Sequence, residues 1–248
     1  MSENKGKVYL VGAGPGDVAY LTVRSQQLLN QAEILVYDAL IDDRLLELVP
    51  KTCQLFDMGK RGGQPSKTQT EINQLLINQC QKGYQIVRLK SGDPFIFGRT
   101  TSEIQALIAA NCNFEVVPGI SSALAAPLLA GIPLTDPVLS RSFTVISAHE
   151  IEELNWEILV EIETLVILMG GKNLSEIIYQ LEKHGRQITT PVAIIRWAGH
   201  PQQEIWQGTL ASIVSQTSGK TLSPCVIVIG EIVKLREYLQ PHAKAKKE

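Results

Sequence analysis

The chain has 248 residues, a hydrophobic content of 44% and a formal net charge of −2. This length can bury a substantial core, in one large or two smaller α/β domains, and the composition is that of an ordinary soluble globular protein. A slightly acidic chain gives no support to nucleic-acid binding, which usually needs a clearly basic domain. No segment approaches the ~20 apolar residues that cross a bilayer, so we expect neither a nucleic-acid nor a membrane partner.

The polar N-terminus, MSENKGK, runs straight into an apolar segment, which predicts that no secretory signal is present. We therefore expect a cytoplasmic-type protein or a mature organellar one. The four cysteines are scattered and form no C-x-x-C pair, so neither a disulfide framework nor a zinc site is expected. The four histidines also lack ligand spacing, and we expect no metal.

The first half of the chain alternates short β-branched runs with amphipathic stretches. The runs predict buried strands at residues 7–12, 33–38, 53–58, 85–90 and 114–119. The amphipathic stretches predict helices at residues 20–31, 42–49, 68–82 and 100–110. Strands that alternate with helices in this way indicate a mostly parallel sheet that is covered on both faces.

The second half begins after a small-residue helix and a proline-punctuated connector at residues 118–137, the expected domain junction. We place one α/β domain at residues 1–133 and another at residues 134–248. Further strands are predicted at residues 142–148, 164–170, 191–199, 203–210 and 225–233, and a helix at 173–185 that ends at a glycine. The third and fourth of these strands are close enough to be antiparallel, so the second sheet should be mixed. Two adjacent α/β domains leave a cleft, where small ligands commonly bind.

A glycine-rich turn follows the first strand at residues 12–17, GAGPGD. It resembles a dinucleotide-binding turn, with Asp38 as the acid that would contact a ribose. However, Pro15 lacks an amide donor, and Asp17 stands where the third glycine of the motif should be and would repel a phosphate. A structural strand-to-helix turn and a turn for another ligand both remain open.

Three later segments also carry polar groups at element ends. Residues 87–99, VRLKSGDPFIFGR, place two phenylalanines and an arginine in a polar turn, which favours a functional role over turn chemistry alone. Residues 58–73 form a basic, glycine-rich loop that is either a solvated face or a clamp for carboxylates. Ser121 and Ser122 start a helix, where they either cap it or bind a carboxylate or ribose.

Taken in order, these segments resemble the tetrapyrrole methylase family. The matching blocks are VGAGPGDVAYLT, AEILVYDALI, MGKRGG followed by QTEIN, VRLKSGDPFIFGR, VVPGISSALAAPLLAGIPLT, LVILMGG and TPVAIIRW. They span residues 8 to about 230, essentially the whole chain. The resemblance implies two α/β domains with a ligand cleft between them, usually in a homodimer. It also implies methylation of uroporphyrinogen III at C2 and then C7 to give precorrin-2, with S-adenosyl-L-methionine as methyl donor and S-adenosyl-L-homocysteine as product.

The resemblance also assigns site residues. Its acid/base pair falls on Asp38 and Lys60. Its cofactor contacts fall on Pro15, Ser91, Gly92, Asp93, Ile96, Ser121, Ser122, Met169 and Ala198. Because the substrate carries eight carboxylates, we expect basic side chains to bind it, namely Arg61, Lys67 and Arg99 with Lys60, Arg88 and Lys90 nearby.

Three alternatives compete with this hypothesis. A methylase that acts on a later corrin intermediate is disfavoured by the GKRGG and GDPFIFGR blocks. A nicotinamide-dependent oxidoreductase is disfavoured by Pro15 and Asp17. A non-catalytic tetrapyrrole-binding protein is disfavoured because Asp38 and Lys60 occur together.

Overall fold

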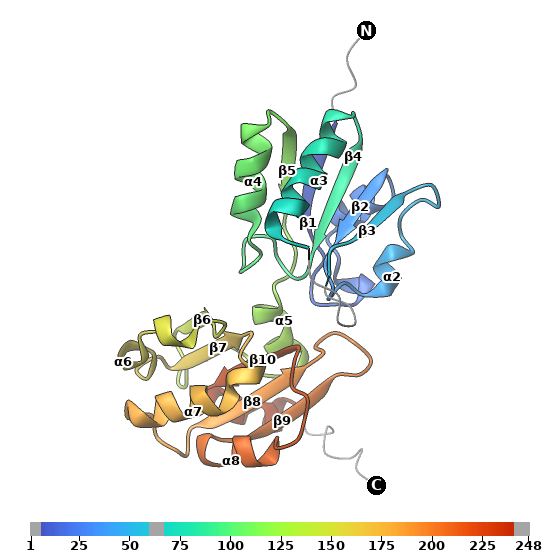
Figure 1. The fold of residues 1–248 in the computed structure, drawn as a ribbon. Coiled ribbons are helices and arrows are strands. Elements are labelled where there is room, and N and C mark those ends of the chain that lie inside the picture. Colours follow the sequence, from blue (N-terminus) through green and yellow to red (C-terminus); the bar gives the residue numbers. More distant parts are fainter. Residues whose placement is uncertain (1–5, 60–66, 241–248) are drawn as a thin grey trace. The chain divides into compact units, whose positions relative to one another are not determined.

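The computed structural model describes residues 6–59 and 67–240 (Figure 1). The chain divides into two compact units, Met1–Ser121 and Ser122–Glu248. Each unit contains one five-stranded sheet with helices on both faces, an arrangement that the sequence predicts for the first unit. None of the described helices combines the length and the apolar character that crossing a membrane requires.

The first unit contains a fully parallel sheet in the order β3-β2-β4-β1-β5. Its strands are β1 Lys7–Gly12, β2 Ile34–Tyr37, β3 Gln54–Asp57, β4 Gln85–Lys90 and β5 Asn113–Val117. Its helices are the 3-10 turn η1 Val18–Tyr20, α1 Val23–Leu29, α2 Asp43–Leu46, α3 Gln69–Gln81 and α4 Thr100–Ala109. The expected parallel sheet is therefore confirmed.

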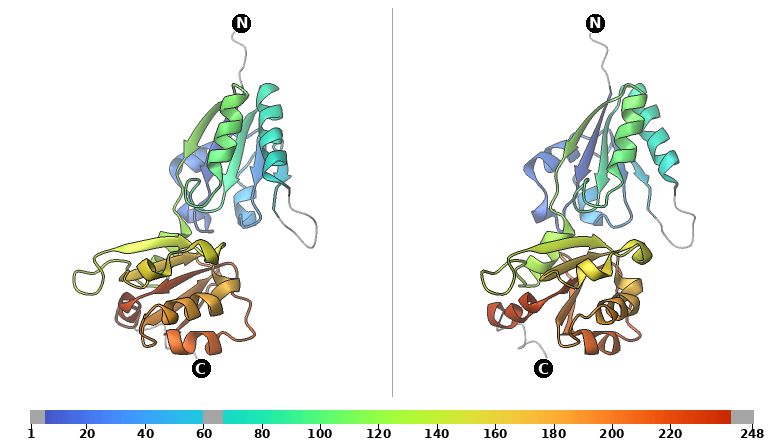
Figure 2. Two further views of the ribbon diagram at one scale, coloured as in Figure 1. Left: turned by 60° about the vertical axis from the view of Figure 1, so that its left-hand side comes forward. Right: turned by 90° about the vertical axis from the view of Figure 1, so that its left-hand side faces the viewer.

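The helices of the first unit cover the sheet in two layers, with α3 and α4 side by side on one face (Figure 2). Leu76 of α3 and Leu107 of α4 belong to one buried apolar cluster with the sheet, and Leu29 of α1 and Leu45 of α2 belong to the other. The helix α3 begins with a capping box, in which the side chains of Thr68 and Glu71 bind each other's backbone amides. Because successive residues of a strand point to opposite faces of the sheet, each strand can contribute side chains to both apolar clusters.

The second unit contains a mixed sheet in the order β6-β7-β10-β8-β9. Its strands are β6 Phe143–Ser147, β7 Thr164–Leu168, β8 Pro191–Arg196, β9 Glu204–Thr209 and β10 Cys225–Ile229. Its helices are α5 Ser122–Leu129, α6 Trp156–Leu159, α7 Leu174–Lys183, α8 Leu210–Gln216 and α9 Arg236–Leu239, with 3-10 turns η2 Ile151–Glu153, η3 Gly171–Asn173 and η4 Glu231–Leu235. The predicted antiparallel pairing of β8 with β9 is confirmed, and α7 ends before Gly185, which has a positive φ of 101°.

The boundary between the units lies before α5, earlier than the expected division between residues 133 and 134. The reason is the packing of α5, whose Ala123 and Ala126 share a buried cluster with Val166 of β7 and Val228 of β10. The helix belongs to the second unit because its small side chains allow it to approach that sheet closely. A proline-rich connector after the helix resembles a linker in sequence, but it does not separate the two cores.

Candidate active site

Four strands of the first sheet lead directly into the segments that the sequence analysis singled out. Because the sheet is parallel, the carboxyl ends of β1, β2, β4 and β5 share one edge. The neighbouring strands β1 and β4 continue to opposite faces, since α1 and α4 pack in different apolar clusters. Open α/β sheets bind ligands at such a reversal. Residues 12–17 and 91–99 therefore occupy the edge position where a ligand is expected.

Backbone contacts between three glycines join the loops at this edge. A Cβ atom on Gly12 would lie 2.5 Å from the Gly119 nitrogen, and one on Gly119 would lie 2.3 Å from the Gly92 carbonyl oxygen. Gly14 and Gly92 exchange backbone hydrogen bonds of 3.0 and 3.2 Å. Gly12 and Gly119 are required because the loops after β1, β4 and β5 touch each other with no room for a side chain at either position. Gly92 has a φ of 68°, which favours glycine.

Two amides of the glycine turn are already used within the protein. The Ala13 amide donates to the Lys90 carbonyl at 2.8 Å, the Gly14 amide donates to the Gly92 carbonyl at 3.2 Å, and Pro15 has no amide hydrogen. A pyrophosphate cradle needs such amides to be available. The geometry therefore agrees with the argument from sequence that this turn does not hold a dinucleotide.

Asp17 has a local structural role in the same turn. Its carboxylate accepts a hydrogen bond from the Ala19 amide at 2.8 Å and caps η1, and it also forms an ion pair with Arg44 at 3.1 Å. The amide hydrogen bond and then Arg44 hold the pKa of Asp17 below its ordinary value. The Asp17 carboxylate, which would repel a phosphate, thus has a structural role as the cap of η1.

Asp38 follows β2 at the same edge, and its side chain is 34% exposed. The guanidinium Nη2 of Arg88 donates to Asp38 Oδ1 at 2.5 Å. Within residues 6–59 and 67–240, no hydrogen bond reaches the other carboxylate oxygen, Oδ2. The predicted catalytic aspartate is therefore anchored by one oxygen, while the second oxygen remains able to accept a proton.

Arg88 and Lys90 lie on β4 with their charged groups enclosed. Both side chains are only 3% exposed, and both bind the carboxylate of Glu103, which is fully buried. Burial alone would lower the pKa of Arg88, but Asp38 and Glu103 outweigh it and raise that pKa. Burial, and then the nearby Arg88, lower the pKa of Lys90. These two cations, which the sequence places near the expected substrate-binding residues, are paired inside the first unit.

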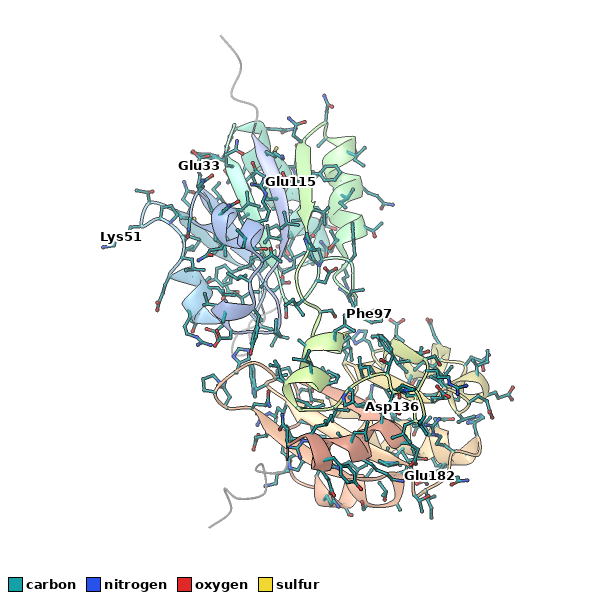
Figure 3. All side chains as sticks on the ribbon, turned by 180° about the vertical axis from the view of Figure 1, so that it is seen from behind. Glu33, Lys51, Phe97, Glu115, Asp136 and Glu182 are labelled. Atoms are coloured by element: carbon teal, nitrogen blue, oxygen red, sulfur yellow. The ribbon has the colours of Figure 1, made fainter. Side chains whose placement is uncertain are left out.

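The turn after β4 is shaped by Asp93. Its Oδ1 accepts the Phe95 amide at 2.8 Å and its Oδ2 accepts the Gly119 amide at 3.2 Å, which ties this turn to the loop after β5. The apolar side chains at the tip are exposed, with exposed fractions of 63% for Phe95 and 48% for Phe97. Figure 3 labels Phe97. The turn thus has a fixed base and an apolar tip.

The remaining predicted residues of the first unit lie on the same edge or outside the described part. Ser91, Ile96 and Arg99 are in or beside the turn after β4 and all three are exposed, while Gly92 is buried at its base. Lys67 is also exposed, and its ammonium lies 3.9 Å from Glu71. Lys60 and Arg61 lie outside the described residues, and Ser121 is buried at the end of the first unit.

Met169 and Ala198 lie at one edge of the second sheet. The strands β7 and β8 are both antiparallel to β10, so their carboxyl ends point the same way. Met169, directly after β7, has a φ of 59° and is half exposed, whereas Ala198, two residues after β8, is partly buried against the apolar cluster that contains α5. Ser122 begins that helix. Met169 is thus an exposed edge residue.

Strained backbone also marks these edges. Among the described residues, left-handed φ values occur at non-glycine positions in Phe97 and Arg99 after β4, in Met169 after β7 and in Trp197 after β8, and elsewhere only at Asn111. Strained residues persist only where the surrounding structure holds them in place, and they cluster at active and ligand-binding sites. Its distribution supports both edges as candidate binding elements.

Glu103 and Gly119 are functional candidates that the sequence analysis missed. Glu103 lies on the buried stripe of α4 together with Thr100 and Leu107. A glutamate in a core-facing helical stripe, next to a strand that contains two cations, could have indicated an internal ion pair. Among the described residues, no group of three or more His, Cys, Asp or Glu side chains could hold a metal ion.

Comparisons with known proteins point to the same family as the sequence blocks. A family model described as Tetrapyrrole (Corrin/Porphyrin) Methylases matches residues 7–214. The chain is 58% identical over 233 residues to the uroporphyrinogen-III C-methyltransferase of Synechococcus elongatus, covering 94% of this chain and 96% of that protein. It is 43% identical over 246 residues to the S-adenosyl-L-methionine-dependent uroporphyrinogen III methyltransferase of Methanosarcina barkeri, covering 96% of each.

A solved structure is also similar over nearly the whole chain. It is the crystal structure of the uroporphyrin-III C-methyl transferase of Thermus thermophilus in complex with S-adenyl homocysteine. The TM-score is 0.81 at 33% sequence identity, and the similarity covers 93% of this chain and 100% of that one.

Proposed function

Because the chain belongs to the tetrapyrrole (corrin/porphyrin) methylase family, we propose that it transfers methyl groups from S-adenosyl-L-methionine to carbon atoms of uroporphyrinogen III. The methyl groups are added at C2 and then at C7, and the product is precorrin-2, which leads to sirohaem or cobalamin. The observation that carries this proposal is the 58% identity, across 94% of the chain, to a protein of this activity. The resemblance that was based on the sequence blocks is thereby confirmed at the level of the family.

The first-unit edge fits a sulfonium cofactor better than a phosphate-bearing one. The Ala13 and Gly14 amides are occupied, Asp17 caps η1 and pairs with Arg44, and the neighbouring turn presents the exposed apolar side chain of Ile96. When bound, S-adenosyl-L-methionine supplies an electrophilic methyl group on a positively charged sulfur. We propose cofactor contacts at Pro15, Ser91, Gly92, Asp93, Ile96, Ser121, Ser122, Met169 and Ala198.

Asp38 is the proposed proton acceptor. Formation of the new carbon–carbon bond breaks the carbon–sulfur bond, and the positive charge passes from sulfur to the pyrrole ring. Loss of a ring proton to Asp38 Oδ2 then restores a neutral ring. Arg88 holds Oδ1 at 2.5 Å, so the carboxylate keeps one orientation during the transfer.

Basic residues near the same edge are proposed to bind the substrate. The eight carboxylates of uroporphyrinogen III need local positive charge in a chain whose net charge is −2. We propose Arg61, Lys67 and Arg99 for this role. Lys60 is proposed to donate or return a proton, or to pair with a substrate carboxylate.

We also propose that the protein acts in the cytoplasm as a homodimer. Its substrate is a highly charged small molecule, which needs an aqueous compartment. Fractionation of cells followed by immunodetection tests the location, and recovery of the protein with the membranes would contradict it.

An anaerobic assay tests the activity. The protein is incubated with S-adenosyl-L-methionine and uroporphyrinogen III, and the product mass is followed. A gain of two methyl groups is expected, whereas no methylation of a verified substrate would refute the proposal. An active protein that methylates only a later corrin intermediate would instead support that alternative.

The role of Asp38 is tested in the same assay. We expect Asp38→Ala to lower kcat by about 100-fold or more, the scale of general acid–base catalysis, with little change in the affinity for S-adenosyl-L-homocysteine measured by calorimetry. Equal losses of turnover and of cofactor affinity would make Asp38 a structural residue.

A further inference from the structure

Three charged side chains are enclosed in the first unit next to Asp38. Arg88 and Lys90 are 3% exposed and Glu103 is fully buried. Removing charges from water is costly, and apolar side chains of similar size often serve stability equally well or better. A role beyond stability is therefore worth seeking for this cluster.

The contacts of the cluster fix the Arg88 guanidinium group on several sides. Its Nε donates to Glu103 Oε1 at 3.0 Å, its Nη1 donates to the Leu89 carbonyl at 3.3 Å, and its Nη2 donates to Asp38 Oδ1 at 2.5 Å. A planar fork of donors can bind two carboxylates simultaneously, which a lysine cannot do. The orientation of Asp38 therefore depends on a group that Glu103 holds from behind.

Lys90 completes the arrangement on the far side of Glu103. Its ammonium donates to Glu103 Oε2 at 2.8 Å, so the two oxygens of one carboxylate bind two different cations. Arg88 and Lys90 alternate along β4 and point to the same face, toward α4. Together with Asp38, the cluster has four charged side chains, two positive and two negative, so its net charge is zero.

We propose that Glu103 and Lys90 are positioning residues that act through Arg88 to hold the Asp38 carboxylate in its catalytic orientation. This inference rests on the proposed function, because the role of Asp38 belongs to it. Neither residue needs to touch the substrate or the cofactor. Glu103 binds Arg88, and Lys90 keeps Glu103 from turning away.

The deciding variant is the double substitution Lys90→Met/Glu103→Met. It removes one charge of each sign, so Arg88 and Asp38 remain a balanced pair and the fold is kept. The Arg88 Nε loses its acceptor, and we expect kcat to fall by about 10- to 100-fold, as for a small misplacement of a catalytic group. The affinity for S-adenosyl-L-homocysteine and the melting temperature should stay close to those of the wild type.

A conservative variant and a matched control separate position from charge. Lys90→Met/Glu103→Gln restores a side-chain oxygen that can accept from Arg88 Nε, and we expect it to recover part of the lost kcat. Glu115→Gln makes the same chemical change in a carboxylate that binds two cations, Lys7 and Arg24, on the strand β5 of the same sheet. This control should keep the kcat of the wild type.

A cycle with Asp38→Asn identifies the pathway of the effect. In that background, Lys90→Met/Glu103→Met should cause no further loss of kcat, because the pair acts through Asp38. Additive losses would overturn the inference, and so would a double variant with the kcat of the wild type. A wild-type protein that methylates no uroporphyrinogen III would instead overturn the proposed function. An Asp38→Asn variant with the kcat of the wild type would overturn the role of Asp38 and the positioning together.

Discussion

Glu115 links the pH to the stability of the protein through its two cationic partners. It lies on β5 in the first unit (Figure 3), and its carboxylate binds Lys7 at 2.7 Å and Arg24 at 3.0 Å. The hydrogen bond from Lys7, and then the one from Arg24, hold the pKa of Glu115 below its ordinary value near 4.5 despite partial burial. The resulting stabilisation is fully present above that ordinary value, and it is lost as the pH falls through the lowered value.

We therefore expect Glu115→Gln to lower the free energy of unfolding at pH 7 by less than about 1 kcal/mol, since this pair is partly exposed. The difference between wild type and variant should shrink below the ordinary pKa of the carboxylate and vanish at lower pH. Thermal unfolding of both proteins at neutral pH and at a pH below the lowered pKa measures it. A difference that is the same under both conditions would contradict the assignment.

Arg88, Lys90 and Glu103 mark the limit of sequence reasoning for single side chains. The catalytic candidate Asp38 could be found from its place after a strand and from the family resemblance. The role of the two cations could not, because it depends on a carboxylate 13 residues beyond Lys90 that only the packing of α4 brings close. Charge in the sequence does not say whether water or a buried partner compensates it.

Backbone contacts of Gly12, Gly92 and Gly119 join three loops. A Cβ on Gly119 would lie 2.3 Å from the Gly92 carbonyl, and neither neighbour can move without shifting its strand end. We expect Gly119→Ala to lower the free energy of unfolding by about 1–3 kcal/mol, the usual cost of overpacking. Urea denaturation measures the change.

Gly219→Ala is a suitable comparison for that variant. Gly219 has a φ of 72°, but nothing lies within 4 Å of the position that a Cβ atom would take, so the substitution meets only backbone strain. We expect it to cost about 1 kcal/mol and to leave methylation unchanged. If both variants were equally stable and active, the close contact of the three loops would not matter.

Most elements could be predicted from the periodicity of apolar residues, whereas their order in the sheets could not. The strand β8 and its antiparallel neighbour β9 are close in sequence, so their pairing was predictable. In contrast, β1 lies between β4 and β5 in the sheet, although both strands are far from β1 in the sequence. The membership of α5 in the second unit depends on contacts of its alanines with β7 and β10, which a proline pattern does not reveal.

The helix α5 has an exposed apolar face that is relevant to the oligomeric state of the protein. Leu124 and Leu128 are one helical turn apart and are 48% and 71% exposed. Adjacent exposed leucines commonly mark interaction surfaces. We propose that they contribute to the homodimer.

Sedimentation velocity tests the homodimer. The wild type should sediment with twice the chain mass of 27.3 kDa, and Leu128→Glu should shift it toward the monomer. Ile158→Glu, at a residue of α6 that is 60% exposed, is the control and should not shift it. A monomeric wild type would contradict the homodimer, and a dimeric Leu128→Glu variant would contradict the part assigned to α5.

The contact of Gly12, Gly92 and Gly119 also has an evolutionary consequence. Since Gly12 and Gly119 leave no room for a side chain, a change at either position is costly without compensation in the neighbouring loops. Diversification of the loops is thus directed to their tips, such as Phe95 and Phe97, whose side chains are exposed. Related enzymes that act on other tetrapyrroles should differ at the tips and retain the junction.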